Sequence, residues 1–167
     1  MSAYIAELRE AIAVSHPLLE KISDEQSRRR PAPGKWSPCE IIGHLIDSAS
    51  NNHQRFVRAQ FQDSLVFPAY DQDAWVLLQG YRNAPWLELL SLWRNFNLHL
   101  ARVMELTPIE ARQRPHTKHN FDQIAWKPIA KTEPATLDYF MADYVGHLRH
   151  HLAQILGPAV TRLPGVS

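Results

Sequence analysis

The segment from Leu137 to Leu156 constrains the fold most, because it carries three histidines within an apolar pattern of helical period. At about 100° per residue, His147 and His151 share one stripe of this helix with two aromatic side chains. His150 lies about 60° to the other side of His147, on a more polar face. We therefore expect a buried helix with His147 and His151 facing the core and His150 at the rim.

Two histidines four residues apart on a buried helical face can both reach one cation, and metallohydrolase helices bind zinc with this spacing. A pair of hydrogen-bonded core histidines without a metal is the structural alternative, and this helix alone leaves both open. No glutamate stands between His147 and His151. The general base of the HExxH pattern is therefore missing, which disfavours a peptidase.

Three more segments repeat their apolar residues with helical period. They cover positions 3–22, 38–61 and 84–105. Ser37, Pro38 and Glu40 match a capping box with proline at the first helical position, so they predict where the second helix begins. Four long helices and no convincing strand predict an all-α four-helix bundle, formed as one domain by residues 1–167. The long joints between the first and second helices and between the third and fourth leave room for crossover connections.

A polar stripe follows the edge of the apolar face on the second helix. Its members are His44, Ser48, Asn51 and Arg55, at i, i+4, i+7 and i+11. Polar groups at the edge of a core cost free energy unless a partner or a ligand uses them. The alternative is that these side chains simply meet water where the helix surface turns outward.

Two connecting segments contain features of their own. Asp71 is placed to cap a short helix that contains Trp75, and Tyr70 with Trp75 would either pad one end of the bundle or line a pocket. Padding is the simpler interpretation. Residues 112–133 show no period, and a joint of this length within a compact domain is usually functional. We expect it to fold over one end of the bundle.

The composition argues against several classes of partner. The 18 basic and 17 acidic residues are interspersed and give a formal net charge of +1, so nothing favours nucleic acid binding. The single cysteine, Cys39, cannot form an internal disulfide, which fits a reducing compartment. There is no leader pattern and no run of about 18 apolar residues. We expect a cytoplasmic protein that does not bind membranes and acts on a small molecule; a homodimer is an open alternative.

Two separated motifs are typical of one family. Lys35–Ser48 reads KWSPCEIIGHLIDS and is followed by Arg55 and Phe56, and Tyr144–Ile155 reads YVGHLRHHLAQI. These motifs resemble the two histidine signatures of the DinB/YfiT-like superfamily, whose members are inferred metal-dependent hydrolases and thiol transferases. The resemblance spans nearly the whole chain. The YfiT branch in particular is similar at Tyr70, Asp71 and Trp75.

The resemblance implies a four-helix bundle in up-down-down-up order, with one divalent metal held by His44, His147 and His151. Members of the superfamily include bacillithiol and mycothiol S-transferases and a thiol-dependent isomerase, and many others have no known activity. Residues 112–133 are longer than the family pattern and do not align with it. The resemblance therefore does not indicate which residues form the rim that faces the substrate.

Three histidine ligands leave a fourth position open, and an open position separates catalytic from structural zinc sites. We expect a metal-dependent thiol S-transferase or related hydrolase that acts on small electrophiles, with zinc or nickel and a low-molecular-weight thiol as cosubstrate. Asp47 is expected to orient a metal-binding imidazole or to act as a base. Arg55 would bind a carboxylate of the thiol. Further candidates for substrate binding are Asn51, Tyr70 and Trp75.

Two alternatives belong to other classes. One is a non-catalytic, stress-related protein that binds a metal or a ligand, and the other is a structural dimerising bundle with core histidines. Metal content separates the structural bundle from the other two, and turnover with a thiol separates the enzyme from the binding protein.

Overall fold

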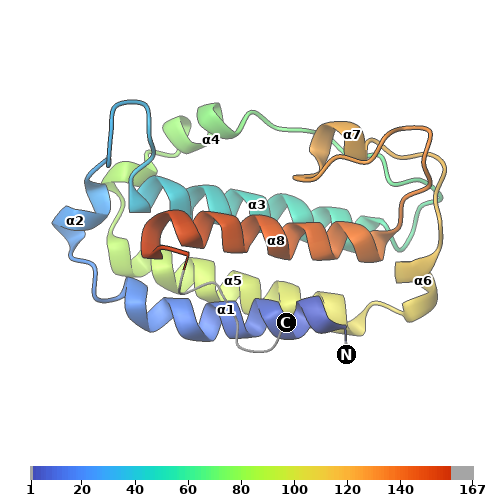
Figure 1. The fold of residues 1–167 in the computed structure, drawn as a ribbon, viewed down its shortest axis with the longest axis horizontal. Coiled ribbons are helices and arrows are strands. Elements are labelled where there is room, and N and C mark those ends of the chain that lie inside the picture. Colours follow the sequence, from blue (N-terminus) through green and yellow to red (C-terminus); the bar gives the residue numbers. More distant parts are fainter. Residues whose placement is uncertain (1, 159–167) are drawn as a thin grey trace.

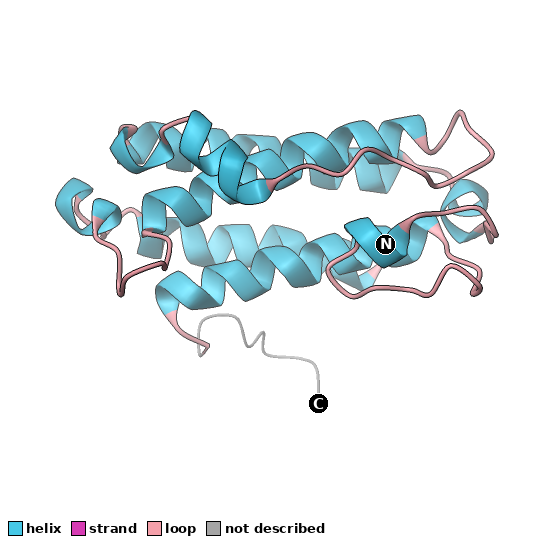
Figure 2. Ribbon diagram, turned by 90° about the horizontal axis from the view of Figure 1, so that it is seen from above, coloured by secondary structure: helices cyan, strands magenta, loops and turns pink. Residues whose placement is uncertain are grey.

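Four long helices lie side by side in the computed structural model, which describes residues 2–158 (Figure 1). They are α1 (Ala3–Leu19), α3 (Pro38–Arg58), α5 (Trp86–Leu106) and α8 (Leu137–Leu156). Short helices occupy the connections: α2 (Asp24–Arg28), α4 (Gln72–Leu78), the 3₁₀ helix η1 (Tyr81–Asn83), α6 (Ile109–Gln113) and α7 (Phe121–Ile124). Over the described residues there is no strand beyond two isolated bridges, as Figure 2 shows, so the predicted all-α bundle is confirmed.

The helices are arranged in the order that the family resemblance implies. Helix α3 packs against α5 and α8, and α1 packs against the same two helices, so α1 and α3 lie diagonally across the bundle. In Figure 1, α1 and α8 run in one direction while α3 and α5 run in the other. The bundle is therefore up-down-down-up.

The long crossover lies elsewhere than we expected. Neighbouring helices α3 and α5 are parallel, so the segment 59–85 between them must return along the whole bundle (Figures 1 and 2). The joints before α3 and before α8, where we expected crossovers, each begin and end at the same end of the bundle, although part of the joint before α8 reaches back over that helix. We expected residues 112–133 to fold over one end of the bundle, but this segment also reaches along its side, since Trp126 lies against Gly146 and beside His150, at and beyond the middle of α8. Apolar period shows where helices form but does not show which of them become neighbours.

Local capping signals set the helix boundaries. The Ser37 hydroxyl accepts a hydrogen bond from the amide of Glu40, whose carboxylate accepts one from the amide of Ser37 at 2.8 Å. Thr136 caps α8 in a similar way, and Gly157 ends α8 with a positive φ of 83°. Helix α1 ends at Leu19, before the predicted position 22, and α3 ends at Arg58, three residues before position 61.

The interior is one apolar core between the four long helices. Side chains such as Leu8, Ile42, Trp93 and Leu148 are fully buried. Burial of this kind is the main favourable contribution to folding, and it involves no metal. Among the described helices, none is long and apolar enough to cross a membrane.

Candidate metal centre

Three histidines meet where α3 packs against α8. His44 comes from α3, and His147 with His151 comes from α8. One nitrogen from each ring lies within 4.8 Å of the other two. The closest approach joins Nε2 of His44 to Nε2 of His147 at 3.1 Å, although these residues are 103 positions apart in the sequence. The structure thus brings together the three residues that the sequence singled out.

The nitrogen spacing fits a small cation. Two ligands of a tetrahedral ion with metal–nitrogen bonds of 2.0–2.1 Å are about 3.3–3.4 Å apart. The 3.1 Å between His44 and His147 is close to that value. The ring planes are nearly perpendicular, at 70–78° to one another, so the rings meet edge to face rather than stacked. With one pair at this spacing and all three nitrogens within 4.8 Å of one another, the three imidazoles could hold one divalent ion.

All three imidazoles are neutral near pH 7. Burial, with a smaller effect of His151, lowers the pKa of His44 from 6.5 to about 3. Burial and the neighbouring histidines lower the pKa of His147 to about 2, and burial also lowers the pKa of His151. Neutral imidazole is the form that binds a metal, so protons compete weakly for these nitrogens.

One of the three rings is oriented by a neighbour on its own helix. Nδ1 of His151 lies 2.8 Å from the amide oxygen Oε1 of Gln154. Because that oxygen only accepts, Nδ1 carries the proton and Nε2 keeps its lone pair. His44 differs, since its Nδ1 is buried and has no hydrogen-bond partner among residues 2–158. His150 is exposed beside Gln154 and Trp126, which confirms its predicted place at the rim.

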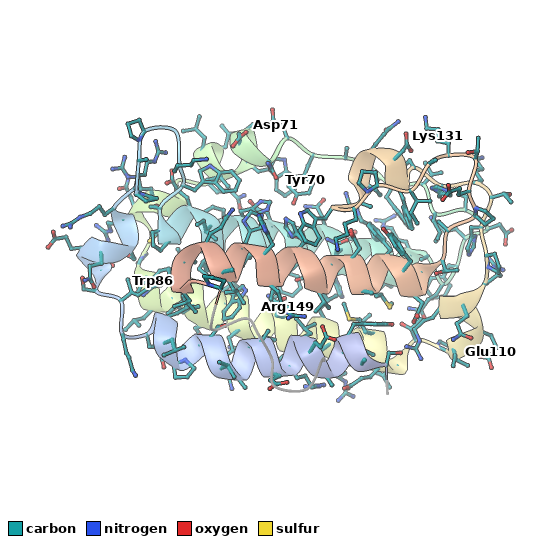
Figure 3. All side chains as sticks on the ribbon, viewed as in Figure 1. Tyr70, Asp71, Trp86, Glu110, Lys131 and Arg149 are labelled. Carbon is teal, nitrogen blue, oxygen red and sulfur yellow. The ribbon has the colours of Figure 1, made fainter. Side chains whose placement is uncertain are left out.

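A cavity of about 250 Å³ adjoins His44 and His147, and we call it the inner cavity. Helix α3 contributes His44, Ser48, Asn52 and Arg55 to its wall, and α8 contributes Phe140, Asp143, Tyr144 and His147. The rest of the wall comes from the connections, including Tyr70 and Trp126. In Figure 3, Tyr70 points from the crossover toward the bundle, whereas Asp71 lies on the outer side.

Asp143 fixes the part of the wall that residues 112–133 provide. Its two carboxylate oxygens accept hydrogen bonds from the amides of Trp126 and Lys127, each at 2.8 Å. Burial raises the pKa of Asp143, against the effect of these two bonds. The Trp126 ring then lies 6.4 Å from the His147 ring and against Gly146, where a Cβ would approach it to 2.9 Å. Asp143 therefore positions Trp126 over the histidines.

The family of the chain follows from its sequence. Residues 7–155 match the sequence model of the DinB superfamily. The chain belongs to the DinB superfamily. This DinB protein is 26% identical over 152 residues to YfiT of Bacillus subtilis, covering 91% of this chain and 80% of YfiT. It is 23% identical over 153 residues to a relative from Geobacillus thermodenitrificans, covering 92% and 80% of the two chains. Both relatives are named as inferred metal-dependent hydrolases.

A solved structure has the same fold. The structure of YfiT from Bacillus subtilis, described as a four-helix bundle of unusual topology, superposes on this DinB protein with a TM-score of 0.75. The match covers 97% of this chain and 89% of YfiT at 22% identity, so it establishes the fold.

Three of the predicted residues lie outside the inner cavity of this DinB protein. Asp47 does not orient His44, because its Oδ1 accepts hydrogen bonds from Gln79 and Tyr81 and its Oδ2 has no partner within residues 2–158. Asn51 donates to the backbone carbonyl of Asp47, and Asn52, one position later, lines the cavity instead. Trp75 contacts Tyr70 but borders a separate groove with Asn51.

Sequence reasoning missed Asp143 and Trp36. Asp143 stands one helical turn before His147, a spacing that brings the two side chains to the same face. The Trp36 ring lies 5.0 Å from the His44 ring and 6.3 Å from the His151 ring. It belongs to a second cavity, of about 700 Å³, which also includes His151, Ile41 and Ile155. The histidines of the DinB protein therefore stand between two cavities.

Proposed function

We propose that this DinB protein is a metal-dependent enzyme that conjugates a low-molecular-weight thiol to small electrophiles, or hydrolyses such electrophiles, at His44, His147 and His151. The convergence of three neutral imidazoles within 4.8 Å carries this proposal. The names of its relatives support metal dependence. The finer assignments, zinc or nickel as the metal and a thiol as cosubstrate, belong to the proposal alone.

The chain would bind the metal through its histidines and would bind and orient small molecules in the two cavities beside them. When bound, a divalent cation contributes Lewis acidity, which lowers the pKa of a coordinated water or thiol. His44 and His147 border the inner cavity and His151 borders the larger one, so small molecules have access to the histidines from two sides. Trp126, held by Asp143, and Trp36 contribute aromatic walls to these two cavities beside the histidine rings.

The test is metal retention together with turnover. The purified full chain loaded with zinc or nickel should accelerate conjugation of a thiol to a reactive halide, with bacillithiol, mycothiol, glutathione and coenzyme A as the panel. His151→Ala should lose both the metal and the rate, because it removes one of three ligands. The matched control is His150→Ala, which changes the neighbouring exposed histidine and should keep both. Equal metal loss in the two variants would contradict the site.

A non-catalytic metal- or ligand-binding protein is the second candidate. It is favoured by one observation: within residues 2–158 the three histidines have no carboxylate partner, and the glutamate of HExxH is missing. Metal retention without a metal-dependent rate with any thiol of the panel would assign the protein to this class.

A further inference from the structure

Arg55 is a buried cation on the wall of the inner cavity. The residue is 5% exposed. Its Nη2 donates to the carbonyl oxygen of Pro68 at 2.8 Å, its Nη1 lies 3.5 Å from Oδ1 of Asn52, and its guanidinium faces the ring of Phe140. These partners are all neutral, and within residues 2–158 no aspartate or glutamate forms an ion pair with Arg55. A buried charge without a counter-charge is destabilising, and an anionic ligand would offset that cost.

The groups around Arg55 are suited to bind an anion. Tyr70 is the titratable neighbour that acts on the charge of Arg55. Burial raises the pKa of Tyr70 to about 12, so its hydroxyl keeps its proton and can donate a hydrogen bond. A guanidinium with a nearby hydroxyl donor matches the two or three acceptor oxygens of a carboxylate or a phosphate.

We propose that the inner cavity binds a small anionic molecule, with its carboxylate or phosphate at Arg55 and its reactive end at the three histidines. The inference rests on the proposed function in one respect, namely that this molecule is a substrate. Arg55 lies 11 residues after His44 on α3, about three turns and roughly 16 Å between the Cα atoms. Since both side chains line the cavity, the ligand is elongated, with its acid group and its reactive group at opposite ends.

One acidic side chain, Asp143, also lines the cavity. It stands on α8 between Phe140, whose ring faces Arg55, and His147. Both its oxygens already accept backbone hydrogen bonds. Since Arg55 has no anionic partner within residues 2–158, the acid group of the ligand is placed at Arg55.

Arg55 also borders a separate groove of about 350 Å³, together with Arg58. Arg58 is exposed and donates to Gln54 on its own helix. Substitution of each arginine in turn therefore distinguishes the two places where an anion could bind. An anion in the groove depends on both, and an anion in the inner cavity depends on Arg55 alone.

The experiment measures binding of inorganic phosphate and of malonate to the metal-free full chain, by calorimetry at constant ionic strength, with malonamide as the neutral analogue. Wild type should bind at least one of the two anions saturably and should not bind malonamide. Arg55→Gln should weaken that binding at least about tenfold, because a charged hydrogen-bond donor is lost. Arg58→Gln should bind as wild type does. Comparison of phosphate with malonate shows which acid group is preferred.

Arg55→Lys keeps the charge without the planar fork and is the second variant, needed if Arg55→Gln does not fold; it should bind several-fold more weakly than wild type. No saturable binding by wild type, or binding that is unaffected by the Arg55 substitutions, overturns the proposal. An equal loss in Arg58→Gln also overturns it, since the anion would then lie in the groove. Because no metal and no turnover are involved, failure of the proposed enzyme activity would leave this result unchanged.

Discussion

Burial of His44 and His147 makes the stability of the metal-free protein depend on pH. Their pKa values in the folded chain are about 3 and about 2, whereas an unfolded histidine has a pKa near 6.5. Between these limits the unfolded state binds more protons than the folded state. Stability therefore rises with pH across this window and falls on acidification below about 6.5. It is at its full value above the unfolded pKa.

We expect the melting temperature of the chelator-treated protein to be flat above pH 7 and to fall as the pH is lowered toward 5. By pH 5 the loss is on the order of 2 kcal/mol for each buried histidine. Thermal denaturation followed by circular dichroism measures it. The double variant His44→Gln, His147→Gln should show a shallower slope, and His150→Ala should keep the slope of wild type. A wild-type melting temperature that is constant from pH 7.5 to 5 contradicts the argument.

The sequence predicted the residues of the centre better than those of the cavity. Spacing along α8 and the two motifs were sufficient for His44, His147 and His151. Asn51 and Asn52 differ by one position, which is about 100° on a helix, and that step decides which of them faces the cavity. Asp143 was missed because its partners are the backbone amides of Trp126 and Lys127, in a stretch with no period to place it.

At the scale of elements, two helical glycines allow close contacts with very different neighbours. A Cβ at Gly43 on α3 would come within 2.2 Å of the buried ring of Tyr81, which is also tied to Asp47 by its hydroxyl. A Cβ at Gly146 on α8 would come within 2.9 Å of the edge of Trp126, a residue that is 40% exposed. The first neighbour cannot move without disturbing the core, and the second can.

The matched substitutions Gly43→Ala and Gly146→Ala should therefore change the free energy of unfolding by amounts that differ in sign or size. Alanine inside a helix is favoured over glycine by about 0.5–1 kcal/mol. At Gly43, overpacking against Tyr81 should cost about 1–3 kcal/mol, which outweighs this gain and lowers the melting temperature. Gly146→Ala should be close to neutral. Urea denaturation of the two variants measures the difference, and equal stability would show that Tyr81 relaxes as easily as Trp126.

Element boundaries were largely predictable because their signals are local. The capping box at Ser37 and Glu40, the cap at Thr136 and the stop at Gly157 each involve residues within one turn of a helix end. The crossover was assigned to the wrong joints because the choice of neighbouring helices depends on packing across the whole bundle. Nothing in segment 59–85 marks it as the one that returns along the bundle.

The whole molecule has a core that is independent of the histidines, so removal of a metal should lower the stability of the fold without unfolding it. A ligand that binds only the folded state at 100 times its dissociation constant stabilises by about 2.7 kcal/mol, or roughly 5–10 °C for a chain of this size. We expect a chelator to lower the melting temperature by that amount and to leave the helical circular dichroism at 25 °C unchanged. Unfolding by the chelator at 25 °C would instead make the metal structural.

The packed helices and the connecting segments contribute different parts of the site. The three histidines are carried by packed helices, whereas Tyr70 and Trp126, which cover the cavity beside them, come from connecting segments. Connecting segments tolerate changes of length and sequence that a packed helix does not. A bundle of this order can therefore change the connecting segments that cover the cavity, and with them the shape of the cavity, while the three histidines on the packed helices stay the same. The residues that could hold a metal and the residues that line the cavity beside them can therefore change independently in the same chain.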